Sequence, residues 1–269
     1  MGKYLTFNQV RAQITSGDSN VFRDFLITQG NLQIQANLGV VSPLGNANRR
    51  SLVPAGPRTA SLSFDYYPTG VGHDNISSAT GDYTTGCAVS FCGYTGYQAY
   101  LNSYTVSIAP YQPVKASVSY SIFGEIAGQL GQTSAFVVST DEIAHAQTSQ
   151  YTNFNTSNFL LDGIQSVNYS INVTREPQYV LGGKFPQASG VLLTSVTREV
   201  AVQGRNLGQA LSYTGLKQGD TVSVQLRSAI SANNIGIPLS ISGTIVSQQL
   251  SAEEAGIVRG SVTVREVLF

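Results

Sequence analysis

The chain has 269 residues, of which 42% are hydrophobic and only 11% are charged, and its 15 basic residues balance 15 acidic ones. This hydrophobic content excludes a largely disordered chain, and the length suits one large β domain or two domains of ordinary size. Zero net charge argues against a dedicated nucleic-acid binder, which needs a clustered basic surface. The low charge favours a subunit that associates with other subunits.

Residues 1–27 are predicted to form an N-terminal arm. Phe7, Val10 and Ile14 have the spacing of one helix face. Two interpretations are open, because the segment can pack on its own domain or reach a neighbouring subunit. The N-terminus has no apolar run of signal-peptide length, and no run in the chain approaches the roughly 18 apolar residues of a membrane helix. We therefore expect the protein to stay in the compartment in which it is made.

Residues 28–126 are predicted to form a first β unit. Its strands are expected where apolar and polar side chains alternate with a period of two, at Leu32–Val40, Thr59–Tyr67, Thr84–Cys92, Tyr104–Ile108 and Ala116–Phe123. In the first of these strands the row predicted to face the core consists of Leu32, Ile34, Ala36 and Leu38. Gly and Tyr are frequent between residues 68 and 103, a composition that predicts long hairpin loops.

Residues 127–163 lose this alternation and are predicted to connect the first unit to a second one. A capping-box spacing at Ser139-Thr140-Asp141-Glu142 predicts one short helix there. Residues 164–269 are the second β unit, with strands expected at Val167–Thr174, Val191–Val202, Thr221–Arg227, Ile237–Val246 and Ser261–Leu268. The same capping-box spacing at Ser251-Ala252-Glu253-Glu254 predicts a short helix before the last strand.

The two units resemble each other, and we interpret the chain as a duplicated β unit. Asn31–Val40 and Val167–Thr174 match as opening strands, and a turn and a return strand follow each of them. The segments KASVSYSIFGE, from Lys115, and RGSVTVREVLF, from Arg259, match as closing strands. Chance is the alternative, since alternating Val and Ser are common in β proteins. Duplication predicts a second inward row made of Val167, Tyr169, Ile171 and Val173.

The chain carries no recognisable catalytic or metal-binding motif. Its two histidines, His73 and His145, belong to no nucleophile–base pattern, and GxSxG, HExxH, P-loop and GxGxxG motifs do not occur. Cys87 and Cys92 lack the second pair of ligands that a structural zinc site requires. We therefore expect free, partly buried thiols, no enzyme activity, no cofactor and no metal.

Adjacent Arg and Glu residues recur near the expected strand ends, at Arg175-Glu176, Arg198-Glu199 and Arg265-Glu266. Neighbours on a strand point to opposite faces, so each residue is predicted to meet a partner on another strand or another subunit. An isolated surface ion pair contributes only roughly 0–1 kcal/mol to the stability of a fold. The alternative role for these residues is to fix the register between neighbouring subunits. The residues predicted to contact other subunits are Arg49, Arg50, Arg175, Glu176 and Lys184.

A strand that ends in REPQYVLGG, followed by Lys184-Phe185-Pro186 and a further strand, is similar to proteins of bacteriophage tails. The pattern resembles tail tube proteins and the related hub and head–tail joining proteins, most strongly over residues 164–202. The resemblance implies a mainly β fold of two similar antiparallel β-sandwich or barrel-like units, each with at most a short helix. It also implies a structural virion protein, which forms rings around a lumen that DNA passes without specific binding.

The resemblance further implies stacked rings of six β units, with loops bridging the rings. A duplicated chain would need three copies per ring, and a hexamer of whole chains stays open. Other tail proteins are expected partners, and the expected location is the virion tail after synthesis in the host cytoplasm, with no membrane anchor. Alternatives are a head–tail joining or baseplate hub ring, a glycan-binding fibre or adhesin using residues 83–104, and a β-sandwich hydrolase supported only by Asp65, Asp74 and Asp82.

Overall fold

The computed structural model describes residues 10–15, 22–25, 27–41, 51–54, 56–68, 86–131, 149–152, 161–181, 185–186, 190–206, 225–228, 241, 243–252 and 258–268. Every regular element in these ranges is a β-strand, and every pair of strands is antiparallel. The predicted mainly β fold is therefore confirmed. Among the described residues, no helix has the length and apolar character needed to cross a membrane.

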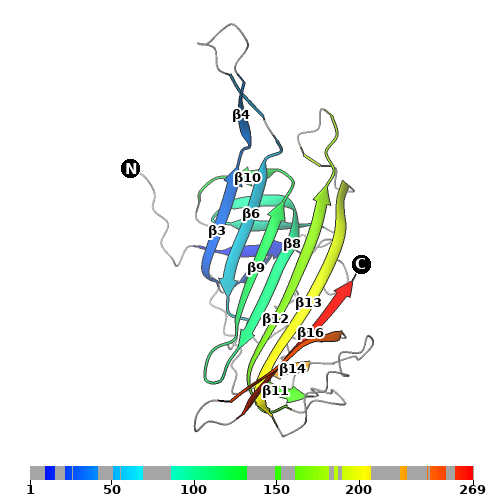
Figure 1. Ribbon diagram of the computed structural model, residues 1–269. Helices are drawn as coiled ribbons and strands as arrows, with labels where there is room; N and C mark the ends of the chain where they lie inside the picture. The colour runs from blue at the N-terminus through cyan, green and yellow to red at the C-terminus, as the bar shows by residue number, and fades with distance from the viewer. Residues whose placement is uncertain are drawn as a thin grey trace.

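The main sheet has the strand order β3-β6-β9-β8-β12-β13-β16-β15 (Figure 1). In that order its strands are Ile27–Gln35, Thr59–Tyr66, Lys115–Ile122, Tyr94–Ile108, Leu161–Pro177, Val191–Asn206, Arg259–Leu268 and Thr244–Ser251. The strands alternate in direction from β3 to β15. The first-half and second-half strands meet where β8 pairs with β12, and we call this pairing the internal seam.

Eight shorter strands complete the description. The N-terminal part of β8 pairs with β7 (Cys87–Phe91) and β10 (Ile126–Gly128), and β7 continues to β1 (Ala12–Thr15) and β2 (Phe22–Phe25). A separate hairpin of β4 (Leu38–Val41) and β5 (Ser51–Pro54) extends beyond the end of the sheet (Figure 1). The remaining pair is β11 (Ser149–Thr152) with β14 (Gln225–Ser228).

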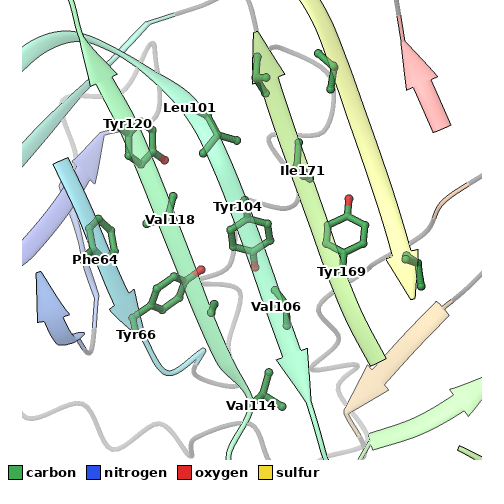
Figure 2. Close-up of a cluster of buried hydrophobic side chains, with 14 of the residues drawn as sticks. Phe64, Tyr66, Leu101, Tyr104, Val106, Val114, Val118, Tyr120, Tyr169 and Ile171 are labelled. Carbon is green, nitrogen blue, oxygen red and sulfur yellow. The ribbon is translucent and has the colours of Figure 1, made fainter. Parts of the chain in front are cut away.

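One face of the main sheet packs into the hydrophobic core. Alternate residues of its strands are buried, and Figure 2 shows Phe64 and Tyr66 of β6 beside Val118 and Tyr120 of β9, with Tyr104 of β8 next in line. Phe25 of β2 covers this face, because its ring centroid lies 5.4 Å from that of Phe64 and 5.0 Å from that of Tyr66. Since β2 does not pair with β6, the β7-β1-β2 strands form a second, sandwich-like layer over the sheet.

The two halves of the chain have the same strand order. In the first half, four strands are neighbours in the sheet in this order: the opening strand β3, the return strand β6, the closing strand β9, and β8, which comes just before β9 in the sequence. In the second half, β12, β13, β16 and β15 repeat it.

The halves also share a β-bulge. Pairing of β8 with β9 shifts between Leu101 and Ser103, and pairing of β15 with β16 shifts between Ile245 and Ser247.

The first predicted inward row is wrong in part. Ile34 is 43% exposed and Leu38 is 53% exposed, and the predicted strand Leu32–Val40 is interrupted between β3 and β4. Ile34 lies on an edge strand with a neighbour on one side only, and Leu38 belongs to the projecting hairpin, so the alternation has no core to face there. The second predicted row is confirmed, since its four members are all buried: Val167, Tyr169, Ile171 and Val173.

One other prediction of secondary structure is also corrected. The predicted strand Thr84–Cys92 agrees with β7, but the loop predicted to extend to residue 103 is instead strand from Tyr94 onward, where β8 begins. The predicted strand Ile237–Val246 lies partly outside the described residues, and the strand described there, β15, spans Thr244–Ser251 with Gln248 and Gln249 in its middle. The predicted helix at residues 139–142, the helix after Ser251 and both histidines lie outside the described residues.

The described part of the N-terminal segment belongs to this chain's own core. Ala12 is fully buried, and Ile14 and Phe25 are 8% and 7% exposed. This agrees with the interpretation in which the segment packs on its own domain. A contact between residues 1–9 and a neighbouring subunit stays a prediction.

Candidate functional site

The second face of the main sheet carries polar side chains across both halves of the chain, and we call it the polar face. Its side chains alternate with the buried rows of the same strands, so the pleat of the sheet directs them away from the core. The principal members are Ser61, Ser63, Asp65, Ser103, Thr105, Ser107, Lys115, Ser117, Ser119, Ser121, Asn168, Ser170, Asn172, Thr197, Glu199, Gln203, Arg205, Arg259, Ser261, Thr263 and Arg265. Hydroxyl groups dominate this surface.

The polar face is continuous across the internal seam. Ser107 of β8 donates a hydrogen bond from its Oγ to Oδ1 of Asn168 on β12, over 2.8 Å. On the next pair of strands, the Ser166 Oγ donates to Oε1 of Gln203 over 3.4 Å. Small hydroxyl and amide side chains therefore satisfy one another between strands, and the first and second halves present one surface rather than two.

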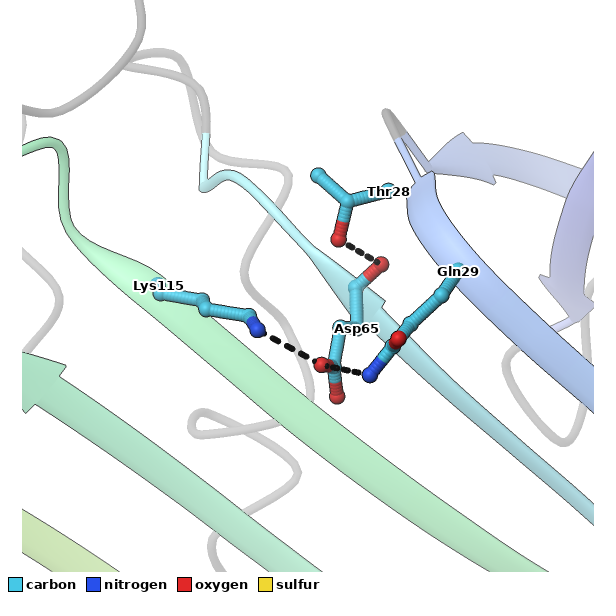
Figure 3. A network of polar contacts seen from close by, with 4 residues as sticks. All are labelled: Thr28, Gln29, Asp65 and Lys115. Atoms are coloured by element: carbon cyan, nitrogen blue, oxygen red, sulfur yellow. Dashed lines mark hydrogen bonds and ion pairs between the residues drawn. The ribbon is translucent and has the colours of Figure 1, made fainter.

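Four charged members of the polar face form two ion pairs. Lys115 Nζ lies 2.8 Å from Asp65 Oδ2, and Arg265 donates from Nη2 to Glu199 Oε2 over 2.8 Å. Figure 3 shows that Gln29 also donates to the Asp65 carboxylate, while the Thr28 hydroxyl donates to the Asp65 carbonyl oxygen. Lys115 and Arg265 thus each have a carboxylate beside them, and these two pairs add no net charge. Arg205 and Arg259 lie on the same face, opposite each other on β13 and β16.

The surroundings of Asp65 set its ionisation. Partial burial raises the pKa of the carboxyl, but hydrogen bonds from Lys115, Ser117 and Gln29 and the charge of Lys115 outweigh burial, so the pKa is lowered from its usual value of 3.8. The hydrogen bond and the charge of Asp65 raise the pKa of Lys115 above its usual value of 10.5. Both groups are therefore ionised over the whole physiological range.

We expect the Asp65–Lys115 pair to stabilise the fold between two pH limits. Its contribution through Asp65 is present above pH 3.8 and is lost as the pH falls through the lower pKa of the folded protein. Its contribution through Lys115 is complete below pH 10.5 and is lost as the pH rises through the higher folded pKa.

Urea unfolding of Asp65→Asn against pH tests this pair. In the wild type, the loss of the ion pair should lower the free energy of unfolding at both ends of the pH range. This decrease should be small, because the pair is partly exposed, and it should be absent in Asp65→Asn. A pH profile of Asp65→Asn that parallels the wild type at both ends would contradict the assignment.

Arg198 and Glu266, from two of the adjacent Arg-Glu sequences, form an ion pair on the core side of the sheet. Arg198 Nη1 lies 3.3 Å from Glu266 Oε2, with both side chains mostly buried. Together with Arg265 and Glu199 this pair confirms that the Arg-Glu residues of β13 and β16 meet partners on another strand. Sequence reasoning left their partners open, because the pairing of β13 with β16 is not visible in a linear pattern.

Arg175 is placed against the core rather than on an open surface. Its guanidinium carbon lies 4.8 Å from the centre of the Tyr100 ring, and its guanidinium nitrogens are buried within the chain. Glu176, the next residue of β12, is exposed. Arg49, Arg50 and Lys184 lie outside the described residues. The structure therefore does not bring these five predicted contact residues together, and their contacts with other subunits stay predictions.

One of the two thiols, Cys87, lies close to this arginine, and Cys92 lies between β7 and β8. Cys87 and Cys92 are free and partly buried, as predicted. Burial raises the pKa of Cys87 to about 12, and the thiol lies 3.2 Å from the carbonyl oxygen of Ala99, to which it donates. Burial also raises the pKa of Cys92. Both thiols are protonated at neutral pH, a state in which a cysteine is a poor nucleophile.

Both edges of the main sheet present exposed strands. Within the described residues, β3 pairs only with β6, and β15 pairs only with β16. Apolar side chains on these edges are exposed, with Ile34 at 43% on β3, and Val246 at 41% and Leu250 at 38% on β15. An exposed edge offers unpaired backbone groups to another strand. Sequence reasoning missed these edges, because an edge is defined by the order of strands.

Apolar side chains also gather at one end of the sheet. The β4–β5 hairpin carries Leu38 and Val40, which are 53% and 63% exposed. The residues after β12, which lie at the same end in Figure 1, include Val180 at 49% and Leu181 fully exposed. Such residues are typical of surfaces that contact another protein.

Comparisons with known proteins leave the family open. No protein-family model matches the chain, and no curated protein matches it.

Proposed function

We propose that this protein is a structural subunit of a bacteriophage tail tube, in which copies of the chain form a ring around a lumen that DNA passes. The observation that carries the proposal is the polar face, which crosses both halves of the chain and holds Lys115 and Arg265 in pairs with carboxylates. As a lumen wall, this face would present mainly hydroxyl and amide groups to the DNA.

The paired charges suit a passage rather than a binding site. A protein that neutralises phosphates with Lys and Arg binds DNA tightly, and each such contact would slow the passage of the molecule. On the polar face, Lys115 and Arg265 are each engaged by a carboxylate. The face therefore offers DNA a wetted surface on which these two cations are engaged, while Arg205 and Arg259 are further cations of the same face.

The sheet is also suited to closure into a ring. Its strands alternate in direction from β3 to β15, so these two edge strands run in opposite directions. An antiparallel ladder between β15 of one copy and β3 of the next would continue the sheet without reversing any strand. Closure of the ring removes the exposed edges, which would otherwise template uncontrolled association.

The shared strand order and the shared bulge support the interpretation of a duplicated unit. Three copies of the chain would then supply six β units to one ring, and the exposed apolar residues at one end of the sheet would contact the next ring. Leu38, Val40 and Leu181 are the described residues best placed for that contact.

Negative-stain microscopy and mass photometry of the purified chain at micromolar concentration test the proposal. We expect rings of three copies that stack into tubes. Single rings that never stack would favour a head–tail joining or hub ring protein instead. A chain that is monomeric at every concentration, salt and pH, without other proteins, would count against both.

The described tyrosines of residues 83–104 divide over the glycan-binding alternative. Tyr100 and Tyr104 are 3% and 0% exposed, whereas stacking on a sugar requires an accessible ring, which Tyr97 offers at 48% exposure.

A further inference from the structure

We infer that β15 of one copy pairs with β3 of the next copy in one fixed register, which places Gln249 opposite Gln33 and Leu250 opposite Leu32 of that next copy. This interface rests on the proposed ring, and it specifies which residues close it. The argument uses the internal seam as a template, because the seam already joins a first-half strand to a second-half strand inside one chain.

The equivalence of β8 and β15 follows from their bulges. In β8 the bulge falls just after Leu101, which is paired with Tyr120, and in β15 it falls just after Ile245, which is paired with Val264. Tyr120 and Val264 occupy the same position in the matching closing segments KASVSYSI and RGSVTVRE. The bulge and the sequence match therefore give one alignment, in which Thr105 corresponds to Gln249.

The equivalence of β3 and β12 follows from their pairing with the return strands. Leu62 of β6 is paired with Tyr120 on one side and with Leu32 on the other. Val200 of β13 is likewise paired with Val264 and with Tyr169.

Leu32 therefore corresponds to Tyr169, and Gln33 corresponds to Ser170. The pairing of both opening strands also becomes irregular at their N-terminal sides, after Ile27 in β3 and after Asp162 in β12.

The internal seam then gives the register between copies. Across the seam, Ser170 is paired with Thr105 and Tyr169 is paired with Val106. Transfer of the first pair to the open edges places Gln33 opposite Gln249, and transfer of the second places Leu32 opposite Leu250. A shift by one residue would exchange the two faces of the joined strands, so register is strongly specified here.

The side chains on the two edges suit this register. Leu250, 38% exposed in the single chain, would meet the partly buried Leu32 on the core side of the joined sheet. On the other side, Gln249 and Gln33 would extend the polar face from one copy to the next. Ser251 would face Asn31, which repeats the Ser–Asn pair made at the seam by Ser107 and Asn168.

Disulfide trapping in the full-length chain tests the register. In a background with Cys87→Ala and Cys92→Ser, one variant carries Gln33→Cys with Gln249→Cys, and another carries Leu32→Cys with Leu250→Cys. Closely and widely spaced pairs alternate along an antiparallel ladder, so the two variants sample both kinds. Six strands separate β3 from β15 within one chain, which excludes an intramolecular bond.

Two register-shifted variants are the matched controls, Gln33→Cys with Ser247→Cys and Leu32→Cys with Gln248→Cys. Their Cβ atoms would be diagonal neighbours, roughly 7–8 Å apart, beyond the reach of a disulfide. After mild oxidation, non-reducing electrophoresis should show linked dimers and trimers for at least one facing pair. Linkage in the shifted controls should be at least about tenfold weaker.

The outcomes separate the register from the ring. Linkage in a shifted control but in neither facing pair would overturn the register and leave the ring intact. Intact rings with no linkage in any variant would show that the ring closes through other surfaces, which also overturns this inference. If the unmodified chain forms no oligomer under any condition, the proposed function fails with it.

Discussion

Ile34→Lys is expected to abolish ring formation while the single chain stays folded. Ile34 is 43% exposed on the edge strand β3, so the monomer accepts a longer polar side chain there. In the inferred ring the same position lies in a strand-to-strand interface, where a lysine ammonium would have to lose water. Edge lysines are a natural device against such pairing. A penalty of roughly 3 kcal/mol per interface would weaken each association roughly 100-fold.

Val267→Lys provides the matched control for this substitution. Val267 is a β-branched residue that is 60% exposed, but it lies on the interior strand β16, where it pairs with Thr197 of β13 beyond the last residue that β15 pairs. Mass photometry should show rings for Val267→Lys and monomers for Ile34→Lys at the same concentration. Circular dichroism should show similar unfolding temperatures for both. Rings of wild-type abundance in Ile34→Lys would contradict the edge assignment.

Ile171→Asn is expected to destabilise the fold itself by about 4 kcal/mol. Ile171 is fully buried in β12, next to the internal seam, where it is paired with Tyr104. The change removes roughly 1.5–3 kcal/mol of apolar burial and places an amide where it has no assigned partner, at roughly 1–3 kcal/mol more. A loss of this size is a large part of the stability of a typical domain, so assembly should fail as well.

Asn172→Ser is the control on the same strand. Asn172 is exposed on the polar face, and serine preserves the hydroxyl character of that surface. Urea unfolding should give a free energy within about 0.5 kcal/mol of the wild type for Asn172→Ser. If Ile171→Asn unfolded at the wild-type urea concentration, the assignment of the inward row of β12 would be wrong.

Interior strands of the sheet are more predictable from the sequence than its edge strands. Val167, Tyr169, Ile171 and Val173 alternate with polar residues because β12 is an interior strand with one buried face. On the edge strand β15 the alternation fails, since a polar residue, Gln248, and the 38% exposed Leu250 occupy the core side of the strand. Alternation of apolar and polar residues indicates a strand with one buried face, and less of the surface of an edge strand is buried.

The early part of β8 was missed for a different reason. Glycine and tyrosine suggested a loop, but Gly96 lies where a strand packs closely against a side chain, because a Cβ there would come within 2.8 Å of Ile122. The absence of a side chain serves packing at this position, not a turn. Composition alone does not distinguish these two uses of glycine.

The polar face was partly predictable, because serine alternates with apolar residues in KASVSYSI and the pattern assigns those serines to one side. The pairing of its charges was not, because Asp65 and Lys115 lie far apart in the sequence and become neighbours only through the order β6-β9. Similarly, Glu199 and Arg265 meet only because β13 lies beside β16.

The internal seam has a consequence for the entropy of assembly. When two free subunits join, the complex loses translational and rotational freedom at a cost of roughly 4–15 kcal/mol. Where β8 meets β12, both strands already belong to one polypeptide, and this junction forms during folding at a high effective concentration. In a ring of three such chains, half of the junctions between β units would therefore be independent of protein concentration. The ring would close at lower subunit concentrations than six separate units of equal contact strength.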